Sequence, residues 1–134
     1  MFCFRCLLLF FCLCSFASKY PGFYSNSVPD AGAFYRSSNY YDDVAFNALW
    51  LYEATGNDAY KKAGYDFYMK HFNTENGAGV WDNFDWDSNS WGAVVLLSRL
   101  FPNDQLIKSR MDGFITSWTK GSQWVQFTPK GLAY

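Results

Sequence analysis

The chain has 134 residues, of which 50% are hydrophobic and 22% aromatic, and its formal net charge is −1 at pH 7. Nucleic acids and acidic lipids attract proteins with a surplus of basic side chains, so the near-neutral balance argues against both as partners. The length is enough for one small domain, and aromatic side chains at this density fill cores or stack on the apolar faces of sugars.

Residues 1–18 have the pattern of a secretory signal peptide. Arg5 supplies a positive charge, an apolar run follows from Cys6 to Phe16, and Ser15 and Ala17 are spaced like a cleavage site. A membrane anchor is the alternative, but the run is far shorter than the ~20 apolar residues that a spanning helix needs. The sequence therefore predicts a secreted, extracellular protein whose mature chain does not contact a membrane.

All four cysteines lie inside this leader, at positions 3, 6, 12 and 14. Removal of residues 1–17 leaves 10 Lys+Arg and 12 Asp+Glu, a net charge of −2. The mature chain is therefore expected to contain no thiol, no disulfide and no Cys-based metal site.

Residues 19–41 are polar and aromatic and contain several helix-breaking residues, which predicts a loop with at most one turn of helix. Asp30-Ala-Gly32 looks like the start of an acidic catalytic turn, since hydrolysis by general acid–base catalysis needs paired carboxylates. Ala33 stands where the second acid would be expected, so Asp30 is interpreted as a turn or cap residue after Pro29.

The next segment predicts a helix over residues 43–55. Asp42 is expected to be its N-cap, Asp43 suits the positive end of the helix dipole, and Gly56 supplies the left-handed residue after the last turn. Apolar residues cover nearly the whole circumference of this helix. Such a helix must be buried on most sides, which places it in an inner layer.

A second helix is expected over residues 58–71, after a Gly-Asn turn. Its apolar positions Tyr60, Ala63, Phe67 and Tyr68 recur at helical spacing and its charges take the other face, so it is amphipathic and lies in an outer layer. His71 is the single histidine and ends this helix, where a cation suits the dipole; a catalytic role is not expected.

A loop is expected at residues 72–88, and the segment 80–91 is acidic and aromatic. Asp85, Asp87 and Asn89 match the first three ligand positions of a calcium-binding loop. Ser90 replaces the required glycine and Leu96 the terminal glutamate, which argues against a helix-hand calcium site. No metal or cofactor is predicted, and a looser calcium site stays open as an alternative.

The same loop also has the residue types of a carbohydrate-binding site. Trp86 can stack on a pyranose ring and Asp87 can accept hydrogen bonds from sugar hydroxyls. The other interpretation is that Asp87 caps the next helix and Trp86 is a packing plug; the two interpretations are weighed evenly and do not exclude each other. Tyr40 and Tyr41 stand at the start of the first inner helix. If both inner helices run the same way, these two tyrosines lie at the same end of the layer as the Trp86 loop. The alternative is that one of the two tyrosines is a packing residue.

Two further helices repeat the pattern. Residues 90–101 are again apolar on all sides, and residues 104–119 are amphipathic after the Pro102-Asn-Asp104 break and cap. The alternation of buried and exposed helices at a spacing of about 47 residues predicts an all-α double layer of α/α hairpins. A HEAT-like solenoid ranks second, since its helices are usually amphipathic in both layers.

Six segments, in order and with family-like spacing from about Tyr20 to the end, resemble glycoside hydrolase family 9, the cellulases of the endo-β-1,4-glucanase type. The most specific are Trp-Leu-Tyr-x-Ala-Thr-Gly at 50–56 and Thr-Pro-x-Gly-Leu-Ala at 128–133. The others are residues 27–35, 39–46, 84–87 and 95–97.

The resemblance implies that residues 19–134 are a partial catalytic domain, about four of the twelve helices of an (α/α)6 toroid, with an inverting mechanism and a cleft for cellulose-like β-1,4-glucan. It implies substrate contacts at Tyr40, Trp86 and Asp87. Phe46 stands where the family usually has tryptophan, and Ser88 where it often has a second aspartate.

The resemblance also implies that the family's catalytic residues lie outside this sequence. The paired aspartates come well upstream of the matched region, and the histidine–arginine motif and the acid glutamate come well downstream of it. We therefore expect an incomplete, middle fragment of a secreted cellulase, with no catalytic residue of its own and no hydrolysis by the isolated chain. The alternative is a non-catalytic glucan-binding or interaction protein derived from the same fold.

Overall fold

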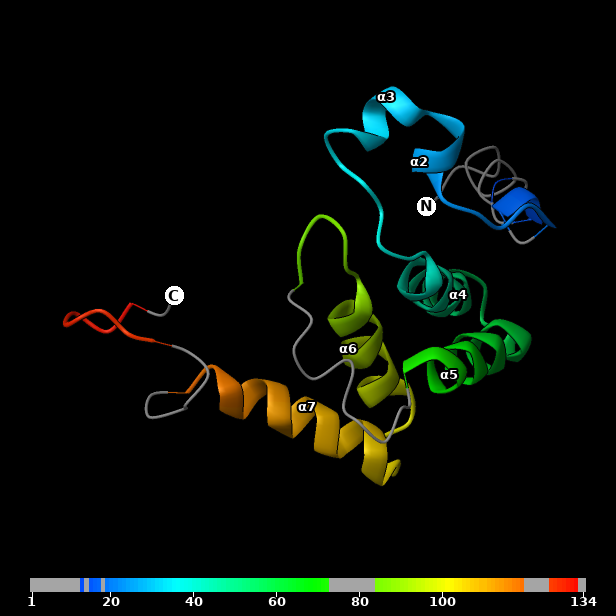
Figure 1. The fold of residues 1–134 in the computed structure, drawn as a ribbon. Coiled ribbons are helices and arrows are strands. Elements are labelled where there is room, and N and C mark those ends of the chain that lie inside the picture. The colour runs from blue at the N-terminus through cyan, green and yellow to red at the C-terminus, as the bar shows by residue number, and fades with distance from the viewer. Residues whose placement is uncertain (1–12, 14, 18, 73–83, 120–125, 133–134) are drawn as a thin grey trace. The chain divides into compact units, whose positions relative to one another are not determined.

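The computed structural model describes residues 13, 15–17, 19–72, 84–119 and 126–132 (Figure 1). The chain divides into two compact units, Met1–Tyr40 and Tyr41–Tyr134. Most of the leader predicted at residues 1–18 lies outside the described residues, so that prediction stays untested. Across the part that is described, no helix combines the length and the apolar character needed to cross a bilayer.

After residue 20, the described part of the first unit contains two single-turn helices, α2 (Tyr24–Ser27) and α3 (Pro29–Gly32). The prediction of at most one turn was therefore wrong. Pro29 starts α3 because its fixed φ suits the first helical position, where its missing N–H would be unpaired anyway. A Cβ added to Gly32 would lie 2.9 Å from the Cβ of Ser25, so the close approach of the two turns needs glycine. Asp30 lies in the first turn of α3.

The described part of the second unit contains two helical hairpins. They are α4 (Tyr41–Thr55) with α5 (Asp58–Phe72), and α6 (Ser90–Leu100) with α7 (Gln105–Ser117). The four helices predicted from the sequence are confirmed, with ends that differ by no more than about two residues. The all-α class and the hairpin arrangement are confirmed as well.

The helix ends show which caps the sequence identified correctly. Gly56 has φ 70° and donates its N–H to the carbonyl of Tyr52 at 2.7 Å, which ends α4 as predicted. Asp104 caps α7 by accepting the N–H groups of Leu106 and Ile107 at 3.0 and 3.1 Å. The predicted N-cap at Asp42 is wrong, because α4 already begins at Tyr41 and Asp42 lies within its first turn.

The inner helices α4 and α6 run in the same direction. Asn89, the N-cap of α6, donates its backbone N–H to the carboxylate of Asp42 in the first turn of α4 at 2.5 Å. In the last turns, Arg99 of α6 lies 3.5 Å from the carboxylate of Glu53 of α4. Contacts that join the two helix starts and the two helix ends require parallel helices, which is the condition under which the two predicted aromatic segments would lie at one end.

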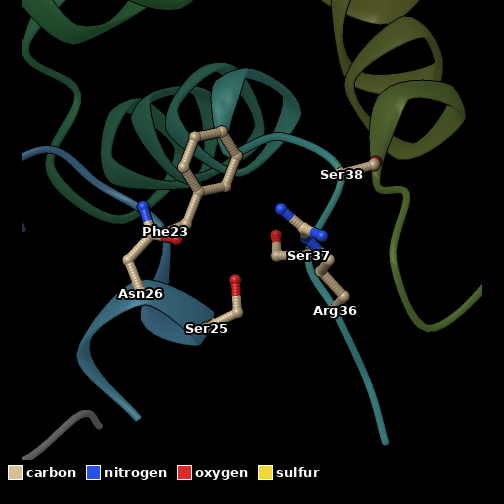
Figure 2. A pocket seen from close by; sticks show the side chains of 6 residues that line it. All are labelled: Phe23, Ser25, Asn26, Arg36, Ser37 and Ser38. Carbon is tan, nitrogen blue, oxygen red and sulfur yellow. The ribbon is translucent and has the colours of Figure 1, made fainter. Parts of the chain in front are cut away.

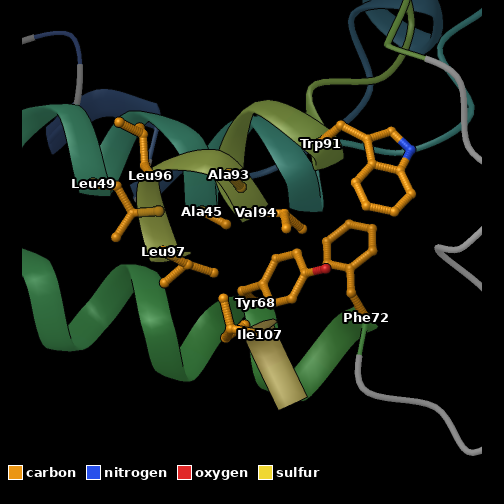
Figure 3. Close-up of a cluster of buried hydrophobic side chains, with 10 residues drawn as sticks. All are labelled: Ala45, Leu49, Tyr68, Phe72, Trp91, Ala93, Val94, Leu96, Leu97 and Ile107. Atoms are coloured by element: carbon orange, nitrogen blue, oxygen red, sulfur yellow. The ribbon is translucent and has the colours of Figure 1, made fainter. Parts of the chain in front are cut away.

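The core lies between the inner pair and the outer helices α5 and α7 (Figure 3). The inner helices contribute small and aliphatic side chains: Ala45 and Leu49 of α4, and Ala93, Val94, Leu96 and Leu97 of α6. The outer helices contribute Tyr68, Phe72 and Ile107. The buried face of α5 is Gly64, Tyr68 and Phe72, one residue away from the stripe predicted through Ala63, which is exposed. The outer helix α7 is tied to α5 by Arg110, which donates to the Tyr68 hydroxyl at 2.8 Å and to the Phe72 carbonyl at 2.5 Å.

Some apolar faces of the second unit are open. Trp50 on α4 is 45% exposed and Val95 on α6 is 41% exposed. The expectation that the inner helices are buried on most sides is therefore wrong on these flanks, because two hairpins do not surround α4 and α6. The end of α7 is open too, since Ile115 in its last turn and Trp118 at its C-cap are exposed.

Candidate functional site

The loop Phe84–Asn89, which leads into α6, is the candidate site. The Oδ1 of Asp85 accepts the backbone N–H groups of Asp87 and Ser88 at 2.9 and 3.1 Å, and the Asp85 N–H donates to the Ser88 carbonyl at 3.2 Å. Aspartate side chains close turns in this way by taking the place of a backbone acceptor. The result is a tight turn with Trp86 at its tip.

The placement of Trp86 and Asp87 argues against the packing alternative. The Trp86 side chain is 67% exposed, so it is not a plug in the core. The N-cap of α6 is Asn89, so a capping role for Asp87 is wrong too. An exposed indole next to a half-buried carboxylate is the arrangement that sugar stacking requires, whereas sugar binding itself stays a prediction.

Asn89 fastens this loop to the first inner helix. Its backbone N–H donates to Oδ2 of Asp42, and its side-chain amide donates to Oδ1 of Asp43 at 2.7 Å. Charged acceptors make such bonds stronger than neutral ones. We call these three residues the carboxylate clamp.

Burial gives Asp42 an unusual electrostatic environment. The residue is 1% exposed, and its Oδ1 has no hydrogen-bond partner among the described residues. Loss of hydration raises the pKa of the Asp42 carboxyl above its ordinary value, and the neighbouring Asp43 carboxylate raises it further, against the opposing effect of the Asn89 N–H. The ionised form therefore costs folding free energy at this position.

Phe84 provides the other attachment of the loop. A Cβ added to Gly92 on α6 would lie 2.7 Å from Cε2 of Phe46 and 3.0 Å from Cε2 of Phe84. Both rings therefore pack over the bare backbone of Gly92. The loop is thus held at Phe84 and at Asn89, with Trp86 between the two attachments.

The two predicted cleft tyrosines have different surroundings. Tyr41 stacks on His71, with ring centroids 4.0 Å apart and an interplanar angle of 10°, so it is the tyrosine that packs. Tyr40 closes the first unit, where its ring meets Phe23 edge-on at 5.6 Å. Of the three predicted substrate contacts, Trp86 and Asp87 lie in the second unit and Tyr40 lies in the first.

His71 has a lowered pKa. Burial is the main cause, and the charge of Lys70 lowers it further. The lowered pKa disfavours the cationic form of His71, which is the form that would suit the dipole at the end of α5.

The first unit has a cavity of about 360 Å³ (Figure 2). It is lined by Phe23, Ser25, Asn26, Arg36, Ser37 and Ser38. Hydroxyl, amide and guanidinium groups around one aromatic ring suit a polar ligand. None of the residues predicted to contact substrate lines it.

The described residues contain no group of three or more His, Cys, Asp or Glu side chains that could hold a metal ion. In the loop proposed to resemble a calcium site, Oδ1 of Asp85 is engaged in the turn and the Asn89 amide donates to Asp43. A loose calcium site stays an alternative that these contacts do not test.

Sequence reasoning missed the carboxylate clamp and the packing of Phe84. One signal could have indicated the clamp, because Asp42 and Asn89 occupy equivalent positions one repeat apart, at the starts of the two inner helices. Equivalent positions on adjacent parallel helices lie side by side. The side-chain directions could not have been read from the spacing.

The comparisons with known proteins agree with the helical hairpins. A family model described as glycosyl hydrolase family 9 matches residues 12–134, a range that begins inside the predicted leader. An endoglucanase of Dictyostelium discoideum is 36% identical over 122 residues, which cover 90% of this chain and 17% of that protein. Endoglucanase 5 of Arabidopsis thaliana is 36% identical over 133 residues, covering 91% of this chain and 21% of that protein. The chain thus spans about a fifth of the length of these curated relatives.

Proposed function

Because the chain belongs to glycosyl hydrolase family 9, we propose that it is part of a secreted endo-β-1,4-glucanase and that its second unit contacts the glucan. Its α/α hairpins are part of the (α/α)6 toroid of that family. Three relatives matched over most of this chain are named endoglucanases. The names support a β-glucan as the substrate class.

The observation that supports glucan contact is the exposed indole of Trp86 on a loop held at both ends. The flat, apolar faces of β-linked pyranoses stack on aromatic rings, and carboxylates accept hydrogen bonds from their hydroxyls. Asp87 directly follows Trp86 in the turn and supplies a carboxylate of this kind. Rigid attachment of the loop lowers the entropy that ordering on binding would cost.

The cleavage step is assigned to carboxylates that this chain does not supply. Inverting hydrolysis needs one carboxylic acid to protonate the leaving oxygen and one carboxylate to activate water on the opposite face of the sugar. Asp85 is committed to closing its turn, and Asp42 is buried and bonded to Asn89. The resemblance to the family implies that its catalytic pair lies outside the matched region, and the proposal rests on that expectation.

Retention on glucan tests the substrate contact. In native gels containing hydroxyethyl cellulose, the chain is expected to migrate more slowly than in gels without polymer, and Trp86→Ala should remove most of this retardation. Trp118→Ala is the matched control, because Trp118 is also exposed but lies at the C-cap of the outer helix α7. Equal retardation of the Trp86→Ala variant and the unaltered chain would overturn the assignment.

Hydrolysis tests the catalytic part of the proposal. Purified chain incubated with soluble cellulose is expected to release no reducing ends above the blank, whereas a complete family domain containing this segment should release them. Release by the 134-residue chain alone would show that its own carboxylates are sufficient.

The exposed loop supports a second candidate, a non-catalytic glucan-binding protein derived from the same fold. Both candidates require retention on glucan. They differ in what a longer polypeptide does when it also contains the remaining segments of the family domain. Only the first candidate predicts that this longer polypeptide hydrolyses glucan.

A further inference from the structure

We propose that Asp42 is a positioning residue for glucan binding and that, with Asp43, it fixes the orientation of the Trp86 loop through Asn89. This inference rests on the proposed function, since it explains how that loop is held. Asp42 and Asp43 start one inner helix, whereas the loop leads into the other.

The geometry of the carboxylate clamp restrains Asn89 in two ways. Asp42 holds the backbone N–H at 2.5 Å and Asp43 holds the side-chain amide at 2.7 Å. One bond to the backbone fixes where the chain passes, and a second bond to the side chain fixes its rotation about that point. Two adjacent carboxylates on the first turn of α4 therefore define the end of the loop more strictly than either could alone.

The position of Trp86 makes this restraint relevant to binding. Trp86 lies three positions before Asn89, and the intervening Asp87 and Ser88 have their N–H groups bonded to Oδ1 of Asp85. The turn therefore moves as one piece. A displacement at Asn89 is transmitted to the indole, and stacking on a sugar depends on the direction of the ring plane.

The cost of the buried carboxylate also points to positioning. Asp42 is nearly inaccessible and leaves Oδ1 without a hydrogen-bond partner among the described residues, an arrangement that costs folding free energy. A small apolar residue would avoid this cost but could not accept the N–H of Asn89. The carboxylate therefore supplies a hydrogen-bond acceptor for the Asn89 N–H, which an apolar side chain at this position could not supply.

Amide exchange tests the clamp without any ligand. In the full chain, the Asn89 N–H is expected to exchange slowly for a loop residue, and Asp42→Ala should accelerate it by about tenfold, which corresponds to the loss of one hydrogen bond. Asp42→Asn is the conservative variant, because its side-chain oxygen can accept the same N–H, and it should restore slow exchange. Unchanged exchange in Asp42→Ala would overturn the clamp.

Retention on hydroxyethyl cellulose then tests the consequence for binding. Asp42→Ala should weaken retention by about fivefold, as expected when one ordering contact is lost, and Asp42→Asn should recover it. Faster exchange with unchanged retention would show that the clamp is structural only and would overturn the positioning role. If the unaltered chain is not retained at all, the proposed function fails while the exchange result still decides the clamp.

A second pair of variants covers the case in which Asp42→Ala does not fold. Asp43 is exposed and Asn89 is half-buried, so Asp43→Ala and Asn89→Ala leave the core intact. If both residues act through their shared bond, the double variant loses no more retention than either single variant. Additive losses would overturn the shared role.

Discussion

Asp42 and Asp104 both lie at the starts of helices, yet their surroundings shift their pKa values in opposite directions. Burial raises the pKa of Asp42. The Tyr65 hydroxyl, 2.6 Å away, lowers the pKa of Asp104, and the N–H groups of Ile107 and Leu106 lower it further. Hydrogen bonds to the ionised form favour it, whereas loss of hydration disfavours it. The two residues therefore contribute to stability in opposite ranges of pH.

Replacing Asp42 by asparagine should raise the thermal unfolding temperature at pH 7. A carboxyl whose folded pKa is raised stabilises the fold most below its unfolded pKa, about 3.9, and this contribution is lost as the pH rises through the folded value. The amide of the Asp42→Asn variant carries no charge at any pH, so the advantage of the variant should shrink as the pH falls toward about 4. Calorimetric scans of both proteins between about pH 4 and pH 7 measure the difference in unfolding temperature. A lower unfolding temperature of Asp42→Asn at pH 7 would contradict the prediction.

Replacing Asp104 by alanine should destabilise the fold by about 1–2 kcal/mol at pH 7, because α7 loses its N-cap. The lowered pKa means that this contribution is present above the unfolded pKa and is lost as the pH falls through the folded value. Tyr65→Phe is the matched control, since it removes only the hydroxyl that donates to Asp104. It should cost about 1 kcal/mol in urea unfolding, and a cost equal to that of Asp104→Ala would mean that capping contributes nothing.

Alanine is expected to have opposite effects on stability at two glycines that lie in the middle of helices. A Cβ added to Gly64 of α5 would lie 2.8 Å from Cδ2 of Leu49 and 3.2 Å from the carbonyl oxygen of Ala45. Gly64→Ala should therefore push α5 away from α4 and destabilise the fold by about 1–3 kcal/mol. Gly113 of α7 has nothing within 4 Å, so Gly113→Ala should stabilise by up to about 1 kcal/mol.

Urea unfolding of the two glycine variants measures the difference directly. Both substitutions add one methyl group and improve helix propensity, so only the close approach of α4 and α5 separates them. If Gly64→Ala were as stable as Gly113→Ala, the hairpin α4–α5 would pack less tightly than the structure shows.

The helices themselves could be predicted from local signals. Gly56 and Asp104 mark ends through backbone conformation and capping, which depend on a few neighbouring residues. The two turns α2 and α3 were missed because prolines and glycines in a short segment suggest a loop. Asp42 was misassigned as a cap because its carboxylate is bound by Asn89 of the next hairpin, a contact that no local pattern contains.

At the scale of the whole molecule, the sequence identified the Trp86 loop as a candidate site but left open whether Trp86 is exposed, and it did not indicate how the loop is held. Trp86 and Asp87 were identified by residue type, and the structure shows that neither is a plug or a cap. Their support comes from Asp42, Asp43 and Phe84, whose contacts cross between hairpins or reach into α6. Such contacts depend on how the inner helices pack, which spacing along the chain does not specify.

The open flanks of the inner helices predict self-association of the chain. Trp50 and Val95 expose apolar surface on helices that are otherwise buried, and exposed apolar faces of this kind mark contacts with other protein. Val95→Lys should increase the monomer fraction in sedimentation velocity across a concentration series, because lysine places a charge on the flank and favours a helix more than valine does.

The control for this prediction is Leu97→Lys, which puts the same charge on the same helix at a fully buried position. It should unfold the second unit, because a buried ammonium without a partner is too costly to retain. If Val95→Lys unfolds the chain as well, the flank of α6 is covered in solution. If the unaltered chain sediments as a monomer at every concentration, the open flanks do not drive association, and the exposed apolar area of α4 and α6 is tolerated by the isolated hairpins.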